Sequence, residues 1–164
     1  MIFSNLNELE VLKIAKGIEE TGYNFYKSAA EKFKDLDVRE MFEHLADEEM
    51  EHMVTFQRIY ERVKEKSLNV DVNSFDKETT AYLTAISETS VFNVNNVTGG
   101  AISLVTTPAD VIKMGIQAEK DSILFYETVL KHTKEELTQK TLRRLIKEEI
   151  KHLHEFKNLL EEVK

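Results

Sequence analysis

The sequence predicts an all-α fold, a four-helix bundle made of two antiparallel helix hairpins joined by one long crossover. Apolar residues recur at alternating steps of three and four along four long segments, which is the spacing of one helix face. Only five Gly and one Pro occur in 164 residues, so little interrupts these helices. We therefore expect a single domain over residues 1–164, with a hairpin at 1–66, the crossover at 67–106 and a second hairpin at 107–164.

The first hairpin contains two long helical segments. The first runs from about residue 5 to residue 33, with Ser4 or Asn5 as the N-cap, because both side chains can accept hydrogen bonds from unpaired N–H groups. The second runs from about Val38 to Lys66. The few turn-like residues between the segments are too short for anything but a tight connection, so the helices are antiparallel neighbours.

The crossover is rich in Asn and Thr and breaks the helical pattern. It contains one short amphipathic segment, Lys77–Ser87, and the pair Gly99-Gly100. No strand precedes these glycines and no Gly-Lys-Ser/Thr follows them, so they are predicted to provide linker flexibility rather than a phosphate-binding loop.

The second hairpin begins with a clear helix start. Thr107 is the expected N-cap, Pro108 suits the first helical position, and Asp110 suits the third. This helix is predicted to end at about Lys131, and the last helix to span about residues 135–163.

Composition excludes several classes of function. The 30 acidic and 22 basic side chains give a net charge of -8, which argues against nucleic-acid binding. Cysteine is absent, which excludes disulfides, thiolate catalysis and Cys-ligated zinc or iron–sulfur sites. No segment approaches 18 apolar residues and the first residues do not resemble a signal peptide, so we expect no membrane partner and a cytoplasmic location.

Polar residues interrupt all four apolar stripes near their middles. Each stripe contains one Glu, and a His follows three residues later in the second and fourth stripes. The residues are Glu19, Glu49, His52, Glu119, Glu149 and His152. A shift of 100 residues superposes the first three on the last three, so the interruptions belong to an internal repeat. The repeat also superposes Glu48 on Glu148, which lie one position off the stripes and are expected to flank the site.

Antiparallel hairpins bring these six side chains to one level in the bundle interior, because Glu and His three residues apart share a helix face. Four buried carboxylates without counter-charge would cost several kcal/mol each. No Lys or Arg lies on the stripes, whereas two divalent cations would neutralise all four carboxylates. Two metal ions are therefore predicted. Oxygen-rich ligands with one imidazole per ion suit iron or manganese, with zinc as a possible substitute.

The same motifs resemble the rubrerythrin family of ferritin-like di-iron proteins. The similar pattern is a Glu followed seven residues later by a Tyr, then Glu-x-x-His, and it occurs twice: Glu19, Tyr26 and Glu49–His52, then Glu119, Tyr126 and Glu149–His152. The resemblance implies a ferritin-like bundle that binds two iron ions and reduces peroxide or O₂. Tyr26 and Tyr126 are candidate hydrogen-bond donors near the ligands, although packing in the core with a bonded hydroxyl is the preferred interpretation.

The sequence departs from the family pattern in two respects. It has no Cys and hence no rubredoxin domain, so electrons would come from a separate donor such as rubredoxin. Ser122 stands where the family usually has a further carboxylate, which makes di-iron binding the firmer expectation and peroxide reduction the conditional one. Iron oxidation or storage, and metal binding without catalysis, are the alternatives. A homodimer is expected.

Overall fold

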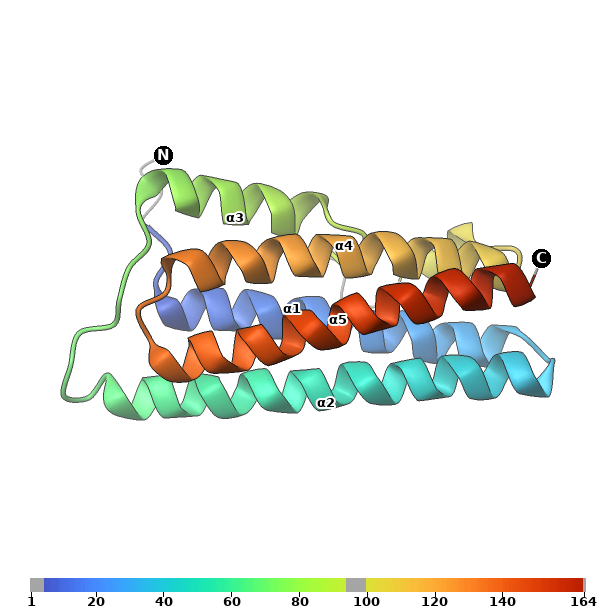
Figure 1. The fold of residues 1–164 in the computed structure, drawn as a ribbon, viewed down its shortest axis with the longest axis horizontal. Coiled ribbons are helices and arrows are strands. Elements are labelled where there is room, and N and C mark those ends of the chain that lie inside the picture. Colours follow the sequence, from blue (N-terminus) through green and yellow to red (C-terminus); the bar gives the residue numbers. More distant parts are fainter. Residues whose placement is uncertain (1–4, 94–99, 164) are drawn as a thin grey trace.

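The computed structural model describes residues 5–93 and 100–163, and they form a bundle of long helices (Figure 1). The elements are α1 (Glu8–Lys32), α2 (Leu36–Lys66), α3 (Lys77–Thr89), the 3₁₀ turn η1 (Gly100–Leu104), α4 (Pro108–His132) and α5 (Glu136–Glu162). The prediction of an all-helical chain is confirmed. Within the described residues, β pairing is limited to one isolated bridge between Asn7 and Ser74.

The first helix begins later than predicted. Its N-cap is Asn7, whose side chain accepts a hydrogen bond from the Glu10 N–H at 2.9 Å, while the Glu10 carboxylate accepts from the Asn7 N–H at 2.8 Å. Asn5 precedes the helix and Ser4 lies outside the described residues. The physical reason for the shift is pairing with the crossover: the Phe75 N–H donates to the Leu6 carbonyl at 2.8 Å, which holds this stretch extended.

The other helix starts agree more closely with the sequence. Asp35 caps α2 by accepting from the Val38 N–H at 3.1 Å, so α2 starts slightly before the predicted residue. Thr107 caps α4 as predicted, with Pro108 in the first turn and Asp110 completing a reciprocal capping box. Backbone N–H groups of Thr106 and Thr107, followed by their hydroxyls, lower the pKa of Asp110 to about 2.

The crossover is more structured than expected. α3 continues to Thr89, beyond the predicted Ser87, and packs against α4 (Figure 1). Gly100 begins the turn η1, and Gly99 lies outside the described residues.

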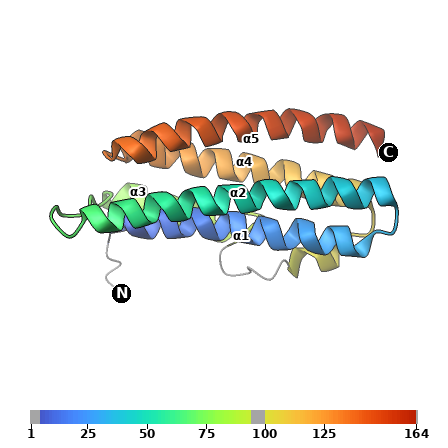
Figure 2. The same ribbon diagram turned by 90° about the horizontal axis from the view of Figure 1, so that it is seen from below.

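Two closely packed helix pairs make up the bundle. α1 packs along α2 and α4 packs along α5, while the pairs meet mainly through α1 and α4 (Figures 1 and 2). α2 and α5 make few contacts with each other. None of the helices in the described part of the chain is long and apolar enough to span a membrane.

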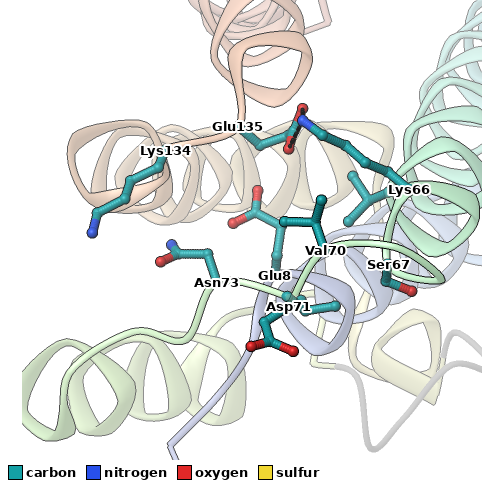
Figure 3. Close-up of a pocket in the computed structure, with 10 residues that line it drawn as sticks. Glu8, Lys66, Ser67, Val70, Asp71, Asn73, Lys134 and Glu135 are labelled. Carbon is teal, nitrogen blue, oxygen red and sulfur yellow. Dashed lines mark hydrogen bonds and ion pairs between the residues drawn. The ribbon is translucent and has the colours of Figure 1, made fainter.

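A cavity of about 180 Å³ lies where α2 passes into the crossover, and a buried carboxylate faces it (Figure 3). Glu8 is only 2% exposed, and its Oε1 accepts a hydrogen bond from the Thr133 hydroxyl at 2.6 Å. Burial raises the pKa of Glu8, although the hydroxyls of Thr133 and Thr138 oppose the rise. Folding therefore makes Glu8 harder to ionise than it is in the unfolded chain.

Replacing Glu8 by Gln is expected to stabilise the protein increasingly as the pH rises. A raised pKa in the folded state means that the stabilising contribution of Glu8 is complete below its unfolded pKa and is lost as the pH rises through its folded pKa. Gln has no such loss. Urea unfolding at pH 4, 5.5 and 7 should show a growing advantage of Glu8→Gln over wild type. Exposed Glu31→Gln serves as the control, and an advantage that stays constant or shrinks with pH would contradict the prediction.

Candidate metal centre

The structure brings the six stripe residues together at the middle of the bundle. Glu19 comes from α1, Glu49 and His52 from α2, Glu119 from α4, and Glu149 and His152 from α5, and all six are buried. They form two clusters of three, one from each half of the chain, and within each cluster the candidate ligand atoms lie within 4.8 Å of one another.

Glu149 joins the two clusters into one centre. Its Oε1 lies 3.1 Å from His52 Nδ1 and its Oε2 lies 3.0 Å from His152 Nδ1. His52 Nδ1 also lies 3.3 Å from Glu19 Oε2. The two imidazole rings stack with their centroids 5.9 Å apart. The Nδ1 atoms therefore face the carboxylates, which is the orientation that ligands require.

Electrostatics within the centre favour added positive charge. Burial, and then the charges of neighbouring carboxylates, raise the pKa of Glu49 and of Glu119. Burial opposes ionisation of Glu149 as well, but hydrogen bonds from His152 and His52 hold its pKa below the ordinary value. Burial would lower the pKa of His152, yet the neighbouring carboxylates of Glu149 and Glu48 raise it to about 10. The metal-free centre thus holds four carboxyl groups against two imidazoles and disfavours ionisation of two of these carboxyls, and its oxygen and nitrogen donors fit two divalent metal ions.

The flanking carboxylates reach across to the opposite half. Glu148 Oε2 lies 3.1 Å from His52 Nε2, and Glu48 Oε2 lies 3.2 Å from His152 Nε2. A carboxylate on the outer nitrogen of an imidazole fixes the ring orientation and leaves the inner nitrogen available for a metal. Glu48 and Glu148 thus lie beside the six stripe residues, and each contacts the histidine of the other half.

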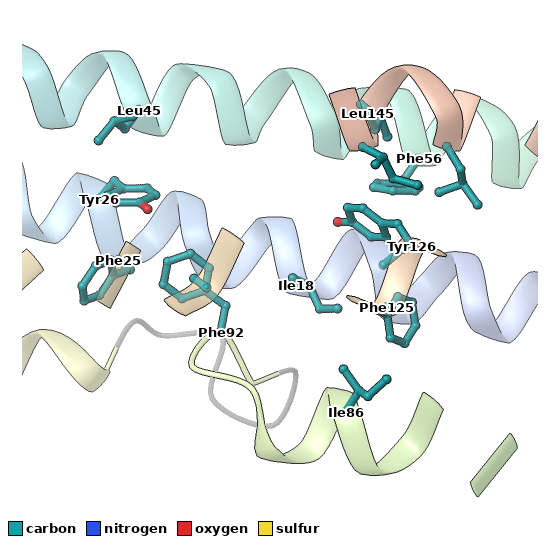
Figure 4. Packing of buried hydrophobic residues seen from close by; sticks show 14 of the residues in the cluster. Ile18, Phe25, Tyr26, Leu45, Phe56, Ile86, Phe92, Phe125, Tyr126 and Leu145 are labelled. Carbon is teal, nitrogen blue, oxygen red and sulfur yellow. The ribbon is translucent and has the colours of Figure 1, made fainter. Parts of the chain in front are cut away.

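The two repeat-related tyrosines are not equivalent. Both are fully buried, and their hydroxyls point toward one another (Figure 4). The Tyr126 hydroxyl donates a short hydrogen bond to Glu19 Oε1, so the partner of this core tyrosine is one of the six stripe residues. The Tyr26 hydroxyl has no hydrogen-bond partner among the described residues, contrary to the preferred interpretation. It lies against Gly115, where an added Cβ would be 2.6 Å from the hydroxyl oxygen.

Two contributors to the site were missed in the sequence. Phe92, from the crossover, packs against Phe25 and Tyr26 with ring centroids 5.3 and 5.7 Å apart (Figure 4). Gly22 lies beneath it, and a Cβ there would be 3.0 Å from both the Phe92 ring and the Glu49 carboxyl carbon. Phe92 therefore covers the centre on the α1 side. The only available signal was an apolar pair, Val91-Phe92, in an otherwise polar stretch.

Comparison with known proteins agrees with this geometry. The family model described as rubrerythrin matches residues 10–160, a range that includes all six stripe residues and both tyrosines. No curated protein and no solved structure gives a significant match. The match covers most of the chain, and we conclude that the protein belongs to the rubrerythrin family.

Proposed function

We propose that this protein is a di-iron carboxylate oxidoreductase that reduces peroxide or O₂ with electrons from an external donor such as rubredoxin. The observation that supports this most strongly is the single buried centre in which Glu149 contacts the histidines of both halves. The proposal assumes a ferritin-like domain in which each hairpin supplies half of the centre. The proposed metal ligands are Glu19, Glu49, His52, Glu119, Glu149 and His152.

The side chains around the centre have distinct tasks in this proposal. Bound iron would supply the electron transfer that converts peroxide, two electrons and two protons into two waters. Tyr126 orients Glu19 through its hydroxyl proton. Glu48 and Glu148 hold the two imidazoles by their Nε2 atoms, and Phe92 excludes water from the α1 side.

Two alternatives compete with this proposal. One is iron oxidation or storage, and the other is metal binding without catalysis; manganese or zinc could occupy the same ligands. The matched Glu and His residues of the two halves favour the oxidoreductase, because sites for iron oxidation more often have unequal halves. The homodimer and the cytoplasmic location remain predictions.

Metal analysis and rapid kinetics test the proposal. We expect the fully loaded protein to hold two metal ions per chain, given its four carboxylates and two imidazoles. Reduced, iron-loaded protein mixed with equimolar peroxide in a stopped-flow instrument should oxidise once, quickly and stoichiometrically, and should turn over repeatedly only when a donor such as rubredoxin is added.

Matched histidine variants serve as the control. His52→Ala should slow the oxidation, whereas His154→Ala should not, because His154 is exposed on the outer face of α5. A ratio of one or zero ions per chain would overturn the di-metal centre. Reduced protein that survives peroxide for minutes would leave a structural metal as the better explanation.

A further inference from the structure

One cavity opens directly onto the candidate centre. It measures about 260 Å³ and lies between α2 and α5, the two helices that make few contacts with each other. His52 and His152 both line it, and each is more than nine-tenths buried. We name this cavity the α2–α5 mouth, and its remaining walls are polar or charged side chains such as Glu48, Glu51 and Lys151.

The opposite side of the centre is closed. Phe92 packs on Phe25 and Tyr26, and a Cβ at Gly22 would be 3.0 Å from both the Phe92 ring and the Glu49 carboxyl carbon. A hydrated cation loses favourable hydration on passing through such an aromatic layer. The polar mouth is therefore the easier route from solvent to the six ligands.

The carboxylates of the mouth are held unequally. Glu148 is bound at both oxygens, with Oε2 at 3.1 Å from His52 Nε2 and Oε1 at 3.4 Å from Arg144. Glu48 Oε2 lies 3.2 Å from His152 Nε2 without an aligned hydrogen bond. Its Oε1 lies 3.4 Å from Nε2 of the exposed His44, which carries a charge only when it is protonated, whereas the Arg144 beside Glu148 is always charged. Glu48 is thus the carboxylate that can more readily change partner.

The outer rim of the mouth is also asymmetric. Glu51 on α2 is exposed, and its carboxylate makes no ion pair with any residue that the structure describes. The repeat-related position on α5 is Lys151, whose ammonium pairs with Glu155 at 3.5 Å. Glu51 and Glu48 are three residues apart and therefore share one face of α2, one nearer the solvent and one nearer His152.

We propose that divalent metal ions reach the centre through the α2–α5 mouth and are taken up first by Glu51 and then by Glu48. The inference rests on the proposed function, because it assigns the route to the proposed di-metal centre. Glu51 attracts the ion at the rim, and Glu48 passes it to the ligands below. Since Glu51 is not a ligand in the loaded state, it changes the rate of loading and not the final affinity.

Cobalt loading of metal-depleted protein tests the route. Co²⁺ is mixed with wild type, Glu51→Gln, Lys151→Gln and Glu31→Gln, and visible absorbance is followed in a stopped-flow instrument. Glu51→Gln should load roughly three- to tenfold more slowly, because loss of a carboxylate weakens the local attraction for cations. Release of Co²⁺ to excess chelator should slow by the same factor, so that the dissociation constant stays unchanged. Lys151→Gln should load faster, and Glu31→Gln, outside the mouth, should match wild type.

The outcomes separate this inference from the proposed function. If wild type binds two Co²⁺ ions and Glu51→Gln loads at the wild-type rate, the route is wrong while the centre stands. If Glu51→Gln and Glu31→Gln slow loading equally, the effect is one of net charge, and the route is again wrong. If wild type binds no Co²⁺, the proposed function fails and the route fails with it. Circular dichroism confirms that the surface variants remain folded.

Discussion

Replacing Glu49 and Glu119 together by Gln is expected to weaken metal binding by more than about a hundredfold, since even residues outside the direct ligand set can cost ten- to a hundredfold. The same change should make the metal-free protein more stable than metal-free wild type. These two carboxyls are the ones whose pKa is raised by burial and by neighbouring carboxylates. Gln retains the shape of Glu while removing a carboxyl group whose ionisation the folded, metal-free centre disfavours.

Glu149→Gln is the matched contrast. Glu149 accepts from both histidines, so its loss leaves two buried imidazoles without their central partner. Breaking a buried pair from one side typically costs about 3–5 kcal/mol. Urea unfolding in chelator and isothermal titration with Co²⁺ measure the two effects separately. If the double variant were less stable than wild type, or if Glu149→Gln left the free energy of unfolding unchanged, the charges of the centre would be balanced in another way.

Truncating Phe56 or Phe156 to Ala is expected to cost about 3–5 kcal/mol of the free energy of unfolding, the usual range for a buried Phe. Both rings are fully buried and each packs on a tyrosine: Phe56 on Tyr126 at 5.3 Å between centroids, and Phe156 on Tyr26 at 6.2 Å. For a chain of this size that loss lowers the melting temperature by roughly 6–20 °C.

Thermal and urea unfolding of the metal-free protein measure this loss. Leu124→Ala is the control, because Leu124 is 42% exposed and its truncation should change stability by less than about 0.5 kcal/mol. Phe56→Leu and Phe156→Leu should lose less stability than the corresponding Ala variants and more than Leu124→Ala. A loss below about 1 kcal/mol in both Ala variants would mean that the core around the centre collapses to fill the space.

The helices and the six stripe residues could be predicted because both depend on local periodicity. Glu49 and His52, for example, share a helix face wherever that helix is placed. The start of α1 could not be predicted, since it depends on Leu6 pairing with Phe75 across the crossover. Such contacts between residues far apart in sequence do not produce a periodic pattern of residue types.

The different environments of Tyr26 and Tyr126 could not be predicted from the sequence either. The repeat makes the two residues identical in pattern, and only the packed structure shows that one hydroxyl meets Glu19 while the other meets Gly115. The packing of Phe92 beside the centre could not be predicted for a similar reason, because it depends on where an irregular crossover returns to the bundle. The sequence thus predicts which side chains meet in the centre better than it predicts their surroundings.

The contacts that cross between the halves bear on the order of folding. Each hairpin is stabilised by neighbours close in sequence, whereas Tyr126 and Glu19 are 107 residues apart and His52 and Glu148 are 96 apart. Contacts between distant residues form slowly, because the chain must first close a long loop. We expect the hairpins to form early and the polar centre to assemble last, when the hairpins dock. Until docking, the carboxylates remain hydrated, so their mutual repulsion opposes only the final step.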